Sequence, residues 1–303
     1  MKNALTFIVL FFSLVVFSQN EGDKHRNNGD LEAAILAYKK VLIQKPTDYV
    51  SNYNLACAYA LMYEKDSAFH YLNNALKNSN SLWSLADNDL FSLTNDKRWI
   101  QIENQQLEKH QKAENKLKRP EYAKELLRLI LKDQSQDYQL DMAKRFFMKN
   151  GKAPHWYYPI SEMKKEIIKG NFEKMEALIE QYGWPTYSKV GKLAADGPLL
   201  VINHHQKEEI RIKYLPKIKE ACFNKEGSCT EFAKIQDRIL VNTDKPQLYG
   251  MQFMYDKNRK LVPLPIGNPE FVDQRRALIG LIPLKDYLKR KINYDFEVKQ
   301  KTK

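Results

Sequence analysis

The chain contains few of the residues that mark fibrous or low-complexity proteins. Only 11 of its 303 residues are glycine and 12 are proline. Collagen-like and low-complexity classes are therefore excluded. Hydrophobic residues make up 43% of the chain, which is enough to bury a packed core and argues against wholesale disorder. The length is typical of two domains.

The short motifs of well-known chemistries are also missing. The sequence contains no nucleophile elbow, no phosphate-binding P-loop, no HExxH zinc motif and no glycine-rich dinucleotide loop. We therefore predict no cofactor and no metal site. Whether the chain is an enzyme stays open at this stage.

Cysteine is scarce, with three residues in an odd count. Cys57 lies in a helical repeat and is interpreted as a buried small hydrophobe. Cys222 and Cys229 flank a turn at 224–227, and an oxidising compartment would permit a disulfide between them. Their spacing alone does not establish that bond. Two cysteines also supply too few ligands for a zinc site.

Only one long hydrophobic run is present, at the N-terminus. Lys2 precedes an apolar stretch from Leu5 to Phe17, and small residues stand near a cut after Ser18. We interpret residues 1–18 as a secretory signal peptide, with an N-terminal membrane anchor as the alternative. The protein is then exported, either periplasmic or secreted, and does not span a membrane after signal removal.

Lysine and arginine outnumber the acidic residues, giving a formal net charge of +12. Removal of Lys2 with the signal peptide leaves 12 − 1 = +11. A basic surface often indicates nucleic acid, but export argues against that partner. An acidic envelope polymer or lipid head groups are better candidates. The simplest interpretation is that scattered lysines keep the protein soluble.

Small residues recur in the N-terminal third at an offset of 34 residues (56 − 22 = 34). The pairs are Gly22 with Ala56, Ala34 with Ala68, and Val41 with Ala75. Close packing of two helices within a repeat demands small side chains at such positions. Residues 19–80 therefore resemble tetratricopeptide (TPR) repeats, which form a concave groove for peptides.

The segment after the repeats resembles an ending common behind bacterial TPR pairs. It carries Asp87, Asp89, Leu90 and Trp99. We interpret it as a cap over the last apolar face of the array, with a ligand contact at Asp87 or Asp89 as the alternative. The TPR-like region and its degenerate cap cover residues 19–101.

The remaining chain is predicted to be a second helical domain. Residues 102–119 are rich in charge and indicate a solvated helical linker. Residues 120–295 form the domain, with a β-hairpin at 247–266, and residues 296–303 form a tail. Ser228 and Glu231 make a capping box for a helix within it. The predicted fold class is mainly α, a TPR helical-hairpin array plus a helical domain with one small hairpin.

Three residues of this second domain are candidate general bases: His204, Asp133 and Asp237. Each has a structural alternative. A histidine at a helix end commonly satisfies a backbone carbonyl. Each aspartate is equally suited to an ion pair with an arginine of another helix.

Further polar residues could bind or orient a substrate through amides, a hydroxyl or anion-binding charge. They are Gln134, Arg238, Gln247, Tyr249, Gln252, Asp273 and Arg276. They could equally tie down neighbouring loops. Gly250 lies inside the first strand of the hairpin and indicates a bulge or a close backbone approach.

Several short motifs of the C-terminal region, taken in their order along the chain, resemble an uncharacterised bacterial domain family of unknown function that often follows TPR units. The matching residues include Asp133-Gln134, Gly183-Trp184-Pro185, His204, Asp237-Arg238, residues 246–250 with Gln252, Asp273 and Arg276. Two positions depart from the family, because Asn203 replaces glutamine and Met251 replaces threonine. The resemblance implies no reaction.

Two functions from different classes follow. The first is an exported TPR-containing protein that binds a protein or peptide through the TPR groove. The alternative is a hydrolase or small-ligand-binding domain that uses a polar pocket in the C-terminal domain. Convergence of the candidate polar residues on one pocket would favour the second.

Overall fold

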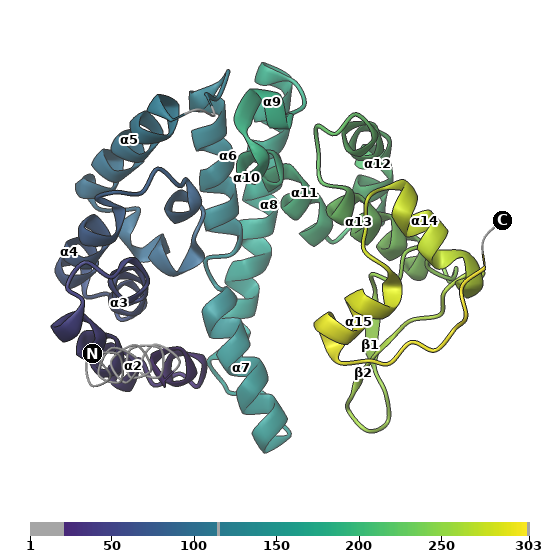
Figure 1. The fold of residues 1–303 in the computed structure, drawn as a ribbon, viewed down its shortest axis with the longest axis horizontal. Helices are drawn as coiled ribbons and strands as arrows, with labels where there is room; N and C mark the ends of the chain where they lie inside the picture. Colours follow the sequence, from purple (N-terminus) through teal and green to yellow (C-terminus); the bar gives the residue numbers. More distant parts are fainter. Residues whose placement is uncertain (1–20, 114–115, 302–303) are drawn as a thin grey trace, which may run out of the picture. The chain divides into compact units, whose positions relative to one another are not determined.

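The structure is a computed structural model that describes residues 21–113 and 116–301. Over these residues the chain is mainly helical, with one two-stranded antiparallel sheet (Figure 1). The prediction of a mainly α protein with one small β-hairpin is confirmed. The predicted signal peptide, 1–18, lies outside the described residues. Among the described residues, no helix combines the length and the apolar character needed to cross a bilayer.

The chain divides into two compact units. The first comprises Met1–Lys116 with Leu127–Ile167, and the second comprises Leu117–Leu126 with Ile168–Lys303. Two helices, α6 (Pro120–Asp133) and α8 (Tyr157–Tyr182), contribute residues to both units. The chain therefore passes twice from one unit to the other in the middle of a helix.

The first unit begins with short helices joined by tight turns. A helical segment at 21–27 precedes α2 (Leu31–Gln44), α3 (Tyr49–Leu61) and α4 (Lys65–Leu76). Asp30 and Asp48 cap α2 and α3, since their side chains accept the backbone N–H groups of Ala33 and Ser51. Fully buried Tyr38, Leu55 and Leu72 lie on α2, α3 and α4.

Small residues permit the close helix packing that the repeat pattern predicts. A Cβ atom on Gly22 would lie 2.4 Å from Cε1 of Tyr38. Ala34, Ala56 and Ala68 are all fully buried. A larger side chain at Gly22 would displace the buried Tyr38 ring.

Two 3₁₀ helices and a long α-helix follow the helix pairs. They are η1 (Trp83–Leu85), η2 (Asn88–Leu93) and α5 (Lys97–Lys112). Residues 102–112 of the predicted solvated linker belong to α5, and Gln106 within them is buried. The Gln106 amide donates to the carbonyls of Ser79 and Ser81 at 2.8 Å each. Helix α7 (Asp137–Asn150) then joins α6 to α8.

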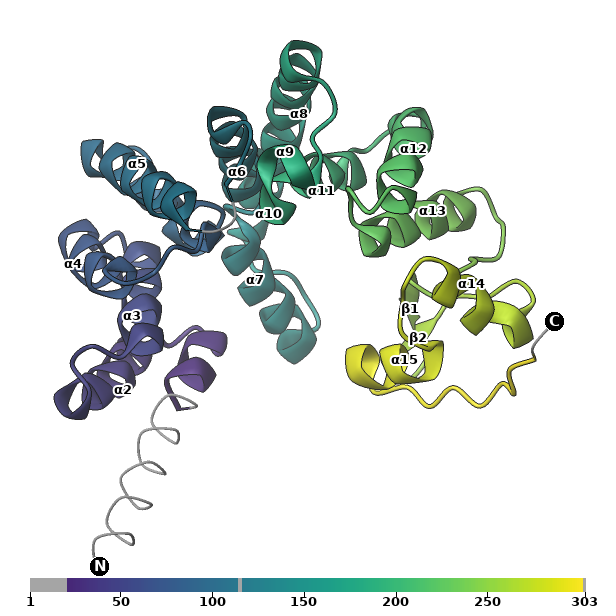
Figure 2. The same cartoon turned by 45° about the horizontal axis from the view of Figure 1, so that its top comes forward.

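The second unit continues with a series of helices. They are α9 (Tyr187–Val190), α10 (Lys192–Ala195), α11 (Gly197–His204), α12 (Glu208–Phe223) and α13 (Cys229–Asn242). Figure 2 shows α12 and α13 side by side. A disulfide joins Cys222, at the end of α12, to Cys229, at the start of α13. Ser228 accepts the Glu231 N–H, as the capping box predicts.

The hairpin and two terminal helices complete the second unit. Strands β1 (Phe253–Tyr255) and β2 (Leu261–Pro263) pair with Met254 opposite Val262. After η3 (Pro269–Phe271) come α14 (Val272–Leu278) and α15 (Leu284–Ile292). Gly250 has φ of +75°, and a Cβ there would lie 2.4 Å from Cδ1 of Leu284. The backbone thus approaches α15 closely at this glycine.

Candidate functional site

A polar pocket of about 520 Å³ opens in the first unit. The helical segment at 21–27, helix α3 and the η1–η2 segment supply its walls. The lining residues are Asp23, Arg26, Asn27, Tyr49, Tyr53, Asn54, Cys57, Trp83, Asp87, Asn88 and Asp89. Three carboxylates and one arginine give the lining a formal charge of 1 − 3 = −2, in a chain whose net charge is +12.

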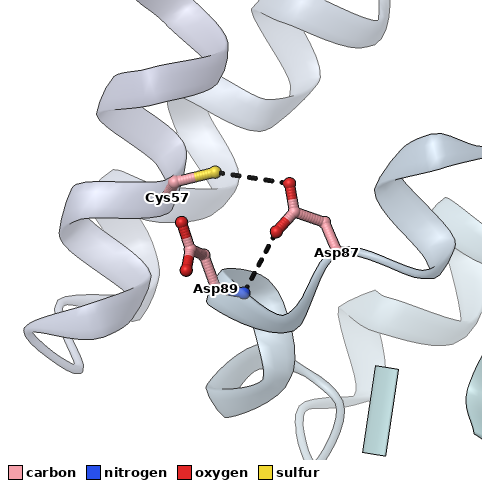
Figure 3. Close-up of side chains that lie close together, drawn as sticks. All are labelled: Cys57, Asp87 and Asp89. Carbon is pink, nitrogen blue, oxygen red and sulfur yellow. Dashed lines mark hydrogen bonds between the residues drawn. The ribbon is translucent and has the colours of Figure 1, made fainter. Parts of the chain in front are cut away.

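Asp87 lies at the centre of the hydrogen bonding in this pocket. Its Oδ2 atom accepts the Tyr53 hydroxyl at 2.8 Å and the Trp83 indole N–H at 3.0 Å. Its Oδ1 atom accepts the backbone N–H of Asp89 at 3.1 Å. The Cys57 Sγ atom lies 4.0 Å from Oδ2 (Figure 3). Asp87 therefore orients the aromatic wall of the pocket.

Asp89 is neutralised by an arginine from the first helical segment. Arg26 donates to Asp89 Oδ2, and its guanidinium lies 5.5 Å from the centre of the Tyr138 ring of α7. Burial raises the pKa of Asp89, the Arg26 charge opposes that rise, and Asp87 adds to it. The Arg26–Asp89 pair is thus satisfied internally, and Asp23 and Asp87 carry the remaining negative charge.

Cys57, Asp87 and Asp89 present potential ligand atoms within 4.8 Å of one another (Figure 3). Metal binding would need a Cys57 thiolate and a free carboxylate. Burial instead raises the pKa of the Cys57 thiol well above its ordinary value, and Arg26 already holds Asp89. These donors fit a hydrogen-bonded cluster better than a metal site.

The aromatic residues of the pocket include partly exposed rings. Tyr49 stacks on Tyr53 with ring centres 5.7 Å apart, and Trp83 is 50% exposed. Asp23 accepts the Tyr38 hydroxyl at 2.6 Å and the Asn54 amide at 3.1 Å. The pocket thus offers exposed aromatic faces beside carboxylates.

The structure brings most of the predicted site residues of the second unit to a different place, the loop 246–252. Asp237, fully buried on α13, accepts the backbone N–H groups of Leu248 at 2.7 Å, Tyr249 at 3.0 Å and Met251 at 3.0 Å. Burial raises the pKa of Asp237, and these three N–H bonds oppose the rise. The carboxylate holds the loop through its backbone.

Two glutamines of the same loop also bond to backbone atoms. Fully buried Gln247 donates to the carbonyls of Gln252 at 3.0 Å and Leu264 at 2.7 Å, and accepts the Gln252 N–H at 2.8 Å. The Gln252 amide donates to the Lys234 carbonyl at 2.9 Å. Both side chains fasten the loop to neighbouring segments.

Arg276 and Asp273 of α14 complete this network. Arg276, 1% exposed, donates to the carbonyls of Tyr249 and Ile282 and lies 4.8 Å from the Tyr287 ring centre. Asp273 accepts the N–H of Leu284, the first residue of α15, at 2.7 Å. We call Asp237, Gln247, Gln252, Asp273 and Arg276 the loop anchor.

The other predicted residues lie elsewhere. Arg238 donates to the backbone carbonyl and side-chain oxygen of Asn203, at 2.6 and 3.0 Å. His204 ends α11 and is half-buried. Asp133 ends α6 in the first unit, fully buried, with Lys164 Nζ at 3.8 Å from Oδ2. Gln134 follows it in the turn before α7.

Residues 121–301 match a family of unknown function, DUF6624. The chain belongs to this family. The match covers the region in which the sequence predicts an uncharacterised domain. No curated protein and no solved structure is significantly similar to the chain.

Within the DUF6624 region, Met251 stands at a position that the structure places inside the loop anchor. Its side chain is 4% exposed, and its Sδ atom lies 3.5 Å from Arg276 Nη1. The Met251 side chain is thus packed against a member of the loop anchor.

The pocket of the first unit lies outside the stretch matched to DUF6624, and the sequence predicts a ligand contact there only as the alternative to a cap. Asp87 and Asp89 were interpreted mainly as part of a cap. One signal points to the pocket: Asp23 and Cys57, both in its lining, are 57 − 23 = 34 residues apart and so occupy equivalent repeat positions.

Proposed function

We propose that this DUF6624 protein is an exported binding protein whose first unit, a TPR-like array, holds a cationic group of a peptide in its pocket. The group is a lysine or arginine side chain or a free N-terminal amine. The observation that carries the proposal is a pocket with exposed aromatic rings beside carboxylates in an otherwise basic chain.

Charge and ring geometry support a cation as the ligand. Arg26 offsets only one of the three carboxylates, so the lining attracts positive charge. Trp83 and Tyr49 present partly exposed faces, and a cation over an aromatic face gains about 0.5–2 kcal/mol as it loses water. A carboxylate ligand would be repelled by Asp23 and Asp87.

The position of the pocket in the array supports a peptide as the ligand. Seven of its eleven lining residues come from the helical segment at 21–27 and from α3, which are equivalent helices of the two proposed repeats, and the other four come from the η1–η2 segment. TPR-like arrays bind extended or helical peptides along such helices. The pocket would accept one side chain while the remaining peptide follows the array.

Titration calorimetry tests the proposal with defined peptides. The mature chain is titrated with a lysine-rich peptide that has a free N-terminus, with its N-acetylated form, and with an N-acetylated form in which glutamate replaces every lysine. We expect binding of the first two and none of the third. Trp83→Ala and Tyr49→Ala should each weaken binding about tenfold.

The matched control is Phe223→Ala, which removes an exposed aromatic ring from the second unit. It should leave peptide affinity unchanged. Equal affinity for the lysine and glutamate peptides, or equal loss in Phe223→Ala and Trp83→Ala, would overturn the assignment of the pocket.

The hydrolase alternative for the second unit stays a prediction. The side chains of the loop anchor bond mainly to backbone atoms, which supports a structural role for them. A substrate screen that finds turnover abolished by Gln247→Ala, with folding intact, would favour the enzyme over the binding module.

A further inference from the structure

The turn between α7 and α8 exposes large apolar side chains. Figures 1 and 2 show α7 extending away from helices α2 to α5 of the same unit. We define the basic-aromatic tip as residues 142–161, at the end of α7 and the start of α8. Its exposed apolar side chains are Phe146 (40%), Phe147 (49%), Met148 (43%), Trp156 (43%) and Tyr158 (61%).

The same tip is positively charged. Lys144, Arg145, Lys149 and Lys152 lie in it, and no acidic residue occurs between Asp141 and Glu162. All four basic residues are exposed. Arg145 pairs with Asp141, whose Oδ2 atom lies 3.0 Å from its Nε atom. With that aspartate included, residues 141–161 carry a formal charge of 4 − 1 = +3.

The tip has a defined backbone conformation. Gly151 ends α7 with φ of +73°, and its N–H donates to the Phe147 carbonyl at 2.8 Å. The Asn150 amide donates to the Phe146 carbonyl at 2.9 Å. Pro154 is buried, and its carbonyl accepts the Tyr157 N–H at 3.0 Å. The apolar side chains thus project from the ordered end of α7, the turn after it and the start of α8.

We infer that the basic-aromatic tip is a docking surface for an anionic lipid membrane. Trp and Tyr side chains are enriched at bilayer interfaces, and lysine and arginine bind anionic head groups while their stems lie along apolar surface. The combination of aromatic and basic side chains at one turn is complementary to such a surface in both charge and hydrophobicity.

The exposed apolar residues distinguish a membrane from other anionic partners. A nucleic acid could stack its bases on the rings, but the export that the sequence predicts argues against that partner. An acidic glycan could pair with the basic residues, but it offers no hydrocarbon layer in which Phe147 and Met148 could be buried. A second copy of the chain would cover the apolar side chains but would place two positively charged tips against each other. A bilayer with anionic head groups satisfies both components.

Vesicle co-sedimentation of the mature chain tests this inference. One set of vesicles is phosphatidylcholine, and the other contains phosphatidylglycerol in addition. We expect preferential binding to the anionic vesicles. Each lysine removed in Lys149→Gln and Lys152→Gln should lower partitioning about fivefold. The double variant Phe147→Ser, Trp156→Ser should lower it at least about tenfold.

The control variant is Lys285→Gln with Lys291→Gln, which removes two exposed charges from α15. It should bind vesicles as the unaltered chain does. Circular dichroism confirms that all variants stay folded, and peptide affinity of the pocket serves as a readout independent of the tip.

Three results would overturn the inference. The first is equal binding to neutral and anionic vesicles, or none to either. The second is an equal loss of binding in the tip and α15 charge variants. The third is a dimer, seen by analytical ultracentrifugation, that Phe147→Ser with Trp156→Ser dissociates while vesicle binding stays unchanged. That last result would assign the surface to self-association.

Discussion

At the scale of single residues, Asp237 combines full burial with three backbone N–H donors. An amide in its place would direct an NH₂ group at one of those donors. We expect Asp237→Asn to lower the free energy of unfolding by about 3 kcal/mol, the size typical of breaking a buried charge-assisted network. Urea unfolding followed by circular dichroism measures the change.

The control for this substitution is Asp244→Asn, at an exposed position just after α13. It should change stability by less than about 0.5 kcal/mol. If Asp237→Asn were as stable as the unaltered chain, the three N–H bonds would not hold the loop in solution, and the carboxylate would return as a candidate catalytic group.

Asp196, at the start of α11, makes stability depend on pH. Burial raises its pKa to about 6, and the nearby charge of Glu231 adds to the rise, against the Tyr187 hydroxyl and the charges of Lys234 and Lys192. The folded state therefore holds this proton more tightly than the unfolded chain. Between pH 4 and 6, the free energy of unfolding should fall with rising pH, by about 2 kcal/mol.

Asp196→Asn isolates this contribution, because asparagine does not titrate. The difference in free energy of unfolding between the variant and the unaltered chain should move in favour of the variant as the pH rises from about 4 to about 7. Urea unfolding at several pH values measures it. A constant difference across that range would show that Asp196 has an ordinary pKa.

At the scale of elements, the Cys222–Cys229 disulfide joins the end of α12 to the start of α13. The loop it closes also supports α9, because Glu226 accepts the Tyr187 N–H through its carbonyl at 3.1 Å and the Ser188 N–H through its carboxylate at 2.8 Å. The disulfide thus constrains a loop that contacts a second element.

We expect Cys222→Ser with Cys229→Ser to lower the free energy of unfolding by about 2 kcal/mol, the chain-entropy value for so short a loop. Thermal unfolding of the double variant and of the unaltered chain, with and without a reductant, measures it. A reductant should destabilise the unaltered chain and leave the double variant unchanged. Equal sensitivity of both proteins would contradict the prediction.

At the scale of the whole molecule, the family match and the structural units begin at different residues. The match starts at 121, yet residues 127–167 belong to the first unit. Arg128 of α6 donates to Glu103 of α5 through Nε at 2.7 Å and also through Nη2, and Glu103 is only 2% exposed. Tyr138 of α7 likewise bonds to the Arg26 carbonyl at 3.2 Å.

A fragment of residues 19–116 would leave the buried Glu103 carboxylate without Arg128. We expect it to be less stable than a fragment of residues 19–167 by about 2 kcal/mol or more. Comparison of thermal unfolding of the two fragments measures this. Equal stability would mean that helices α2 to α5 fold independently of α6 and α7.

Local patterns predicted a large part of the fold. The 34-residue offset of small residues predicted short helices in the region of α2, α3 and α4, and the capping box of Ser228 and Glu231 predicted the start of α13. Gly250 indicated a close approach, which the structure shows against Leu284. These features succeed because helix periodicity, capping and glycine conformation depend on residues a few positions apart.

The sites were less predictable, because they depend on residues far apart in the chain. The sequence predicts Asp237 as a candidate general base and Arg276 as a candidate anion-binding residue. Their partners in the structure are backbone atoms, which no side-chain pattern reveals. Asp23 and Asp87, which share a pocket, are 64 residues apart (87 − 23 = 64). Their sequence neighbours alone suggested a helix and a cap.

The sequence by itself determined that this protein is helical, that small residues recur at a 34-residue offset in its N-terminal third, and that its C-terminal region belongs to one family, since composition, spacing and ordered motifs are local properties. Only the tertiary structure decided which polar side chains face solvent and which form hydrogen bonds with backbone atoms. The physical reason is that the free energy of a buried carboxylate depends on the donors that folding brings to it. Asp237 and Asp87 carry the same side chain, yet folding makes one an anchor and places the other in the wall of a pocket.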